Sequence, residues 1–146
     1  MTSTALAATL FGPEDLRIEL TEDTSMTMPI ANHHIHFFTS SVDDTKAWYV
    51  KTFGATPGKR GRFEAADLPG VNLSFSQADG SVPTKGRVLD HIGFEVQNLE
   101  AFCKKLEGQG QKFDVAYRKV PSLGISIAFL TDPWGTYIEL TEGLRK

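Results

Sequence analysis

The sequence predicts an α+β domain made of two βαβββ modules, because one strand-like motif occurs twice and similar elements follow each copy. "NHHIHFF" (32–38) resembles "LDHIGFEV" (89–96) when His34 is aligned with His91, a displacement of 57 residues. Each motif precedes a predicted helix and then strand-like segments. We therefore expect two modules and a linker, at about 30–77, 88–146 and 76–88.

The two predicted helices have recognisable starts and ends. The first, 42–53, opens at Ser41 with a capping-box-like pattern and stops before Gly54. The second, 99–107, opens at Asn98. Its apolar residues fall at i, i+3, i+4 and i+7, which places them on one helical face: Leu99, Phe102, Cys103 and Leu106.

The segments after each helix have strand character and are separated by turn residues. In the second module, "DPWG" (132–135) has the Asp, Pro and Gly spacing of a type I turn, so it should join two strands as a hairpin. The expected strands cover 61–67 and 70–77 in the first module, and 113–120, 124–131 and 136–142 in the second.

Composition narrows the function. A chain of 146 residues with 40% hydrophobic residues can bury one core. A net charge of −3 with no basic stretch argues against nucleic acid as a partner. No apolar run approaches the roughly 20 residues that span a bilayer, so we expect no membrane segment. The single cysteine, Cys103, excludes an internal disulfide and is expected to be a core residue. We expect a cytoplasmic protein.

Strand alternation brings three chemically suitable side chains to one face of the sheet. Apolar neighbours should face the helices, so His34, His91 and Glu139 point to the opposite face. Two imidazoles and one carboxylate suit a divalent metal such as Fe(II), Mn(II), Zn(II), Ni(II) or Co(II), and three protein ligands leave positions open for a substrate. His33 should point to the helix side or cap an edge. The alternative to metal binding is that these three side chains are ordinary polar residues, hydrogen-bonded within a half-buried surface.

The paired modules, the "DHI.F.V" strand and the closing "DP.G..IEL" resemble the vicinal oxygen chelate superfamily. That family contains glyoxalase I, extradiol dioxygenases, fosfomycin-resistance transferases and bleomycin-resistance proteins. The resemblance covers about 30–143. It implies that the mixed sheet curls into a cup-shaped, partly open barrel with helices outside, that one divalent metal sits inside, and that the protein is a homodimer. It also implies the metal ligands His34, His91 and Glu139. Whether the cup forms within one chain or by exchange of modules stays open.

The resemblance implies an enzyme acting on a small substrate that chelates the metal through vicinal oxygens. The order His, His, Glu is closest to extradiol dioxygenases and fosfomycin-resistance transferases. A lactoylglutathione-lyase-like isomerase is an alternative, but the position of its fourth ligand holds Ser74. A metal-free binding protein of the bleomycin-resistance type is another. We expect catalytic roles for His36 and Tyr137, and expect Phe38, Ser74 and Glu95 to line the substrate pocket.

The N-terminal segment contains an echo of the C-terminal strand. "PEDLRIELTE" (13–22) aligns with "PWGTYIELTE" (133–142) at a displacement of 120, with six of ten positions identical. We interpret residues 1–29 as an extension carrying a strand that resembles the last strand of a preceding module, which suggests a longer protein or descent from one. A chance match is the alternative. We expect this strand at a sheet edge; folded over the cup instead, it would offer Glu19 as a further ligand.

Overall fold

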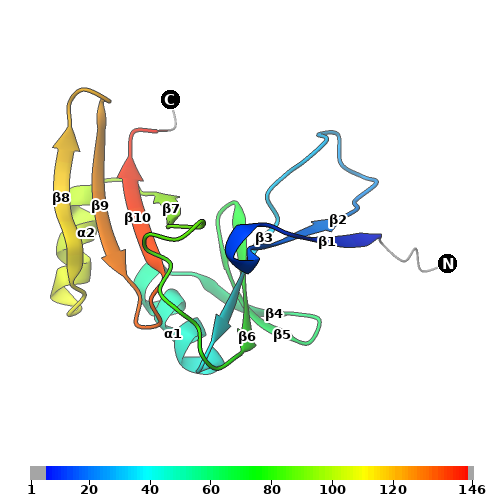
Figure 1. Ribbon diagram of the computed structural model, residues 1–146. Coiled ribbons are helices and arrows are strands. Elements are labelled where there is room, and N and C mark those ends of the chain that lie inside the picture. The colour runs from blue at the N-terminus through cyan, green and yellow to red at the C-terminus, as the bar shows by residue number, and fades with distance from the viewer. Residues whose placement is uncertain (1–5, 145–146) are drawn as a thin grey trace.

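The computed structural model describes residues 6–144 and confirms the predicted pair of βαβββ modules (Figure 1). The first module contains β3 (His34–Thr39), α1 (Val42–Phe53), β4 (Thr56–Arg60), β5 (Phe63–Leu68) and β6 (Val71–Gln77). The second contains β7 (Ile92–Glu95), α2 (Leu99–Gly108), β8 (Phe113–Val120), β9 (Ile125–Thr131) and β10 (Tyr137–Glu142).

Each module forms its own four-stranded mixed sheet. The strand orders are β3-β6-β5-β4 and β7-β10-β9-β8, so the first and last strands of each module are neighbours. They pair in parallel, whereas the remaining pairs are antiparallel. Among the residues described, the two sheets do not close into a barrel, and β3 and β7 are edge strands. The predicted fold class, α+β and partly open, is therefore confirmed.

The core lies between the helices and the sheets. The predicted apolar stripe of α2 packs on β9 and β10, and Leu99, Leu106, Leu130 and Leu140 are all fully buried. Burying a leucine side chain in this way contributes roughly 1.5–3 kcal/mol of hydrophobic free energy. The two modules share the core, because the Phe53 ring at the end of α1 stacks on Phe102 of α2 with 6.4 Å between centroids.

The helix ends follow the sequence closely. The α1 helix ends at Gly54, whose φ of +72° is a left-handed conformation that glycine adopts without strain. Ser41 does not cap the backbone of α1; its hydroxyl donates instead to Asp44, 2.7 Å away. Asn98 accepts a hydrogen bond from the Ala101 amide at the start of α2.

One strand of the first module was missing from the prediction. β4 carries Pro57 and Gly58, which are typical of turns rather than strands, and it lies at the edge of its sheet. An edge strand tolerates these residues because only one side of its backbone must pair. The propensity of the segment therefore gave the wrong prediction.

The linker between the modules is fixed to the start of β10. The Thr84 amide donates to the Gly135 carbonyl at 3.0 Å, and the Tyr137 amide donates to the Thr84 hydroxyl at 2.9 Å. Pro83 lies so close to Gly135 that a Cβ there would sit 2.9 Å from the Pro83 Cα. Gly135 also has a φ of +94°, so two independent constraints require glycine at this turn.

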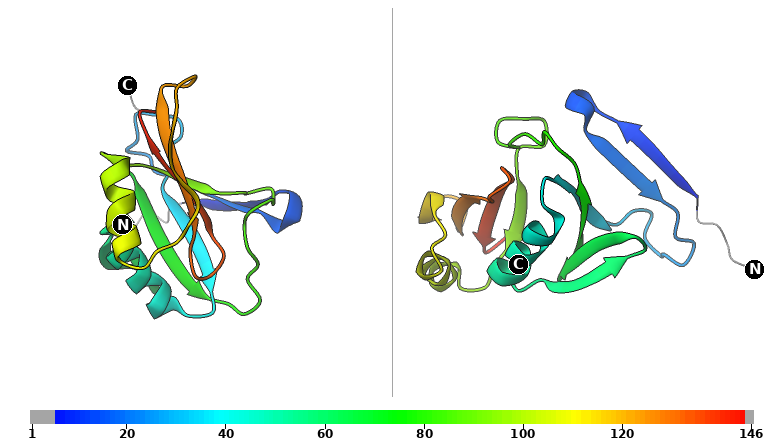
Figure 2. Two further views of the ribbon diagram at one scale, coloured as in Figure 1. Left: turned by 90° about the vertical axis from the view of Figure 1, so that its left-hand side faces the viewer. Right: turned by 90° about the horizontal axis from the view of Figure 1, so that it is seen from below.

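The N-terminal segment forms a separate hairpin, which corrects the expectation of a sheet-edge strand. β1 (Ala7–Phe11) and β2 (Arg17–Thr21), joined by the short 3₁₀ helix η1 (Pro13–Asp15), pair only with each other among the residues described. Figure 2 shows this hairpin standing beside the first module rather than extending its sheet. Across residues 6–144, none of the helices has the length and apolar content needed to cross a membrane.

Candidate metal and substrate site

His91 and Glu139 meet at the mouth of the second module. β7 and β10 run in parallel, and Glu139 lies opposite Gly93 in their register, two residues beyond His91. The Nε2 atom of His91 and the Oε2 atom of Glu139 are 3.2 Å apart, and both side chains are partly exposed. A Cβ at Gly93 would lie 3.9 Å from Oε2, an ordinary van der Waals contact, so the pair does not depend on glycine at this position.

A second carboxylate holds the other side of the imidazole. The Nδ1 atom of His91 is 2.8 Å from the Oδ1 atom of Asp90. A hydrogen bond from the Gly86 amide, and then the one from His91, lower the pKa of Asp90, so its carboxyl stays ionised. When Nδ1 donates to Asp90, the lone pair of Nε2 is directed at the position beside Glu139. Imidazoles that bind metals are commonly oriented by a carboxylate in this manner.

Aromatic side chains form one wall of this site. The rings of Phe129 and Tyr137 stack with 5.0 Å between centroids, and His91 lies edge-on to both. The Lys85 ammonium of the linker sits 4.3 Å from the Tyr137 ring centroid. The site therefore combines an apolar wall, a cation and a His–Glu pair. Tyr137, which we predicted as catalytic, is buried in this wall.

The other predicted histidines lie on the sheet of the first module. His34 and His33 have their Nδ1 atoms 2.9 Å apart, so one imidazole donates to the other and His33 is not isolated on the helix side. The Nε2 atom of His36 is 2.8 Å from the Ser76 hydroxyl, and its ring stacks on Phe38 at 5.0 Å.

Burial lowers the pKa of His36, and the nearby His34 and Arg17 lower it further, whereas Glu19 opposes this change. This lowered pKa favours the neutral form of the His36 imidazole. A neutral imidazole can accept a proton from a substrate.

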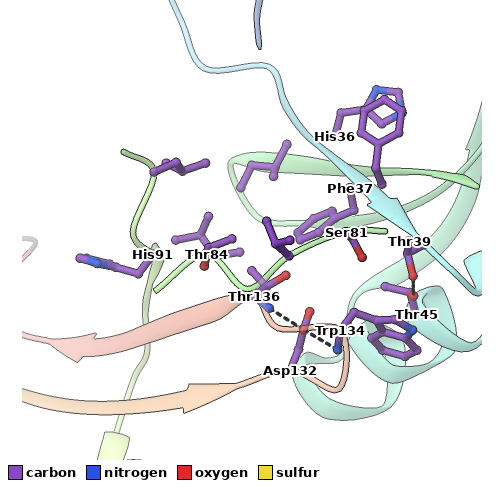
Figure 3. A pocket seen from close by; sticks show the side chains of 15 residues that line it. His36, Phe37, Thr39, Thr45, Ser81, Thr84, His91, Asp132, Trp134 and Thr136 are labelled. Atoms are coloured by element: carbon purple, nitrogen blue, oxygen red, sulfur yellow. Dashed lines mark hydrogen bonds between the residues drawn. The ribbon is translucent and has the colours of Figure 1, made fainter. Parts of the chain in front are cut away.

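The structure brings together two of the three predicted metal ligands. Within residues 6–144, no three His, Cys, Asp or Glu side chains of one chain are grouped closely enough to hold an ion. His91 and Glu139 form a pair, while His34 stays with the histidines of β3. Figure 3 shows His36 and His91 on opposite sides of the cavity between the modules. A shared ion on all three ligands remains a prediction.

The remaining predicted residues have mixed surroundings. Phe38 is 42% exposed, which suits a pocket wall, whereas Ser74 is buried next to His36 in the strand register. Glu95 accepts hydrogen bonds from the amides of Gly143 and Leu144 and from the Thr141 hydroxyl. Glu95 thus holds the chain that leaves β10, a place that differs from the pocket lining we predicted for it.

Residues that sequence reasoning missed line the junction of the modules. A cavity of about 150 Å³ lies there, walled by the edge of β3, the linker and the "DPWG" turn. Its polar groups include Thr39, Thr45 and Asp132, and its apolar groups include Phe37 and Trp134. The sequence analysis also missed Asp90 and Lys85 at the His91 site. An aspartate directly before the candidate ligand His91 could have indicated a carboxylate that orients the imidazole.

Comparison with known proteins agrees with this architecture. The family model of the Glyoxalase/Bleomycin resistance protein/Dioxygenase superfamily matches residues 31–140. A search of curated proteins finds no match.

Solved structures share the fold at low sequence identity. A glyoxalase/bleomycin resistance protein/dioxygenase from Alicyclobacillus acidocaldarius is 19% identical with a TM-score of 0.61, over 82% of this chain and 96% of that one. The oxidase ChaP-H2 is 16% identical with a TM-score of 0.66, over 80% and 95%. An integron cassette protein from V. cholerae is 21% identical with a TM-score of 0.60, over 80% and 97%. At these identities the likeness shows the fold alone, but the family model covers most of the chain. This chain belongs to the glyoxalase/bleomycin resistance protein/dioxygenase superfamily.

Proposed function

We propose that this protein is a divalent-metal-dependent enzyme acting on a small substrate that binds the metal through two neighbouring oxygens. The observation that carries the proposal is the His91–Glu139 pair, with Asp90 behind the imidazole. The ligand type matches Fe(II), Mn(II), Zn(II), Ni(II) or Co(II).

The spacing of the pair fits one ion. Two donor atoms that each lie about 2.1 Å from a metal, at an angle of about 90–100° there, are about 3.0–3.2 Å apart. The separation of Nε2 and Oε2 is 3.2 Å. Glu139 lies in β10 and His91 directly precedes β7, which pairs with β10, so both donors are held close to the sheet.

We further propose that His34 of a second copy is the third ligand, so the enzyme is a homodimer with two shared sites. His34 occupies in its module the place that His91 occupies in the other, on an edge strand with one side of its backbone open. A two-fold axis that brings β3 of one copy towards β7 and β10 of the other gives both sites the same composition. This arrangement is one of the two left open by the sequence.

The residues of the chain have distinct expected tasks. A bound divalent ion supplies Lewis-acid stabilisation of negative charge on the substrate oxygens. Asp90 keeps the His91 ring oriented. The rings of Phe129 and Tyr137 exclude water from one side, and the Lys85 ammonium favours an anionic substrate. His36, whose Nε2 atom lies 2.8 Å from the Ser76 hydroxyl, is suited to accept a proton.

Metal binding by purified protein tests the proposal. Titration with Co(II), followed by its visible absorption, should give one ion per chain, and His91→Ala and Glu139→Gln should abolish the high-affinity step. Asp90→Ala should weaken binding by about 10–100-fold, the usual effect of losing a group that orients a ligand. Glu100→Gln, at an exposed glutamate that pairs with Lys104 on α2, serves as the control. Equal binding by wild type, His91→Ala and Glu139→Gln would overturn the assignment.

A metal-free binding protein is the second candidate, because the cavity of about 150 Å³ between the modules combines apolar side chains such as Phe37 and Trp134 with hydroxyl groups such as those of Thr39 and Thr45. This candidate predicts ligand binding that Glu139→Gln leaves unchanged, because Glu139 does not line the cavity. The isomerase alternative receives less support, since Ser74 supplies no carboxylate and is buried.

A further inference from the structure

The β1–β2 hairpin matches the β9–β10 hairpin in connection length and strand register. Both have five-residue connections between strands, and Ala8 and Leu10 match Ala128 and Leu130 at the same displacement of 120 that relates 13–22 to 133–142. The register is also the same: Leu10 lies opposite Ile18 as Leu130 lies opposite Ile138, and Ala8 lies opposite Leu20 as Ala128 lies opposite Leu140. The resemblance is therefore one of structure as well as sequence.

The two hairpins differ completely in burial. Ala128, Leu130, Ile138 and Leu140 are all 0% exposed. Their counterparts in the first hairpin are open, since Leu10, Ile18 and Leu20 are 53%, 46% and 45% exposed. The equivalent apolar faces therefore differ: the face of β9–β10 is buried, whereas the face of β1–β2 is exposed to solvent.

The cover of β9–β10 shows what such a face requires. Leu99, Cys103 and Leu106 of α2 pack on it, and β7 pairs in parallel along the outer edge of β10. A strand followed by an amphipathic helix therefore supplies both the missing hydrogen bonds and the missing apolar cover.

The apolar face of β1–β2 points away from the first module. The opposite face contacts it through Arg17, whose guanidinium lies 4.8 Å from the Phe38 ring centroid. Glu19 on that same face acts on the charge of His36. Because side chains alternate along a strand, Ile18 and Leu20 are directed outward. Figure 2 shows the hairpin projecting from the body of the molecule.

We propose that this outward face binds the strand–helix part of a further βαβββ module, so that β1 and β2 serve as the last two strands of that module. Helix α2 of a second copy cannot supply this cover, since its Leu99 and Leu106 are already fully buried in its own core. The occupant is a strand and an amphipathic helix of the β7–α2 kind whose apolar stripe is still uncovered.

A fusion that supplies this segment tests the inference. A second copy of residues 88–126, which contain β7, α2 and β8, is joined at its C-terminal end directly to Ala7, and the chain then continues from Ala7 to Lys146. The fused copy then stands before β1 as the original stands before β9. We expect amide exchange at Ile18, Glu19 and Leu20 to slow by at least about tenfold relative to the unfused chain, because local opening must now break a packed core.

Two comparisons make the result decisive. In the fusion, Leu20→Asp should restore fast exchange in β2, whereas in the unfused chain the same substitution should leave thermal stability nearly unchanged. Slow exchange in β10 reports that the main domain is folded. Should the fusion disturb that domain, the 88–126 peptide added in trans replaces it, with Leu99→Asp in the peptide as control. Exchange in β2 that stays fast beside a folded domain, or unperturbed β2 resonances with the peptide, would overturn the inference.

Discussion

Removing one hydroxyl tests whether the two modules are held together by a buried polar contact. The Tyr49 hydroxyl of α1 donates to the Oδ2 atom of Asp132 in the "DPWG" turn at 3.0 Å. Both residues are almost fully buried, at 0% and 4% exposed. Burial, and then the Asp132 charge, raise the pKa of Tyr49 well above its usual range, so the hydroxyl remains a donor at all ordinary pH values.

The size of the effect follows from this geometry. Tyr49→Phe keeps the ring, which packs on Phe37 and Phe75, and removes only the donor. The other Asp132 oxygen still accepts from the amides of Trp134 and Thr136. A hydrogen bond to a buried charged acceptor contributes about 1.5–3 kcal/mol, so unfolding free energy should fall by about that amount.

Urea denaturation at pH 7, followed by circular dichroism and tryptophan fluorescence, measures the change. Tyr117→Phe is the matched control, because its hydroxyl is 3.5 Å from the Ser126 hydroxyl and only partly buried. We expect that control to stay within about 0.5 kcal/mol of wild type. A Tyr49→Phe protein as stable as the Tyr117→Phe protein would refute the reasoning.

Three further predictions concern charge, thiol chemistry and the linker. Hydrogen bonds donated by lysines, first of all Lys46, lower the pKa of Glu64 from 4.5 to about 2, so the stability that they give is complete above pH 4.5 and is lost towards pH 2. In Glu64→Gln the urea midpoint should therefore fall less steeply between pH 4.5 and pH 2 than in the wild type. A pH dependence of the midpoint equal to that of the wild type would contradict this. Burial raises the pKa of Cys103 to about 11, so Ellman's reagent at pH 8 should label it only at the rate of unfolding, and rapid labelling of native protein would contradict this. Gly135→Ala should cost about 1–3 kcal/mol in thermal denaturation, because Pro83 and the positive φ both oppose a side chain there; an unchanged midpoint would contradict it.

The repeated motif made most of the fold predictable. Setting His34 on His91 aligned two strands that do occupy the same place in their modules, and the apolar stripe through Leu99 and Leu106 does enter the core. β4 escaped because Pro57 and Gly58 oppose strand formation locally, and only its edge position permits them.

The alternation of side chains along a strand predicted which site residues share a face of a sheet, but not how the two sheets are placed. Alternation placed Glu139 on the face of His91, and their parallel strands do bring them together. It could not give the distance between two sheets, so it did not reveal that His34 pairs with His33 in one chain. Nor does alternation describe backbone-directed contacts, which is why the hydrogen bonds of Glu95 to the chain after β10 were missed.

Subunit complementation tests the shared metal site most directly. His34→Ala and His91→Ala chains are each expected to bind no metal tightly. When they are mixed, unfolded and refolded together, half of the dimers should be mixed, and each of those should regain one of two sites, giving about a quarter of the wild-type metal content. Mixing His91→Ala with Glu139→Gln should restore none, because both defects lie on the same side of the site. Recovery in the first mixture alone is the result we predict; no recovery in either would contradict a metal held between His34 of one copy and the His91–Glu139 pair of another.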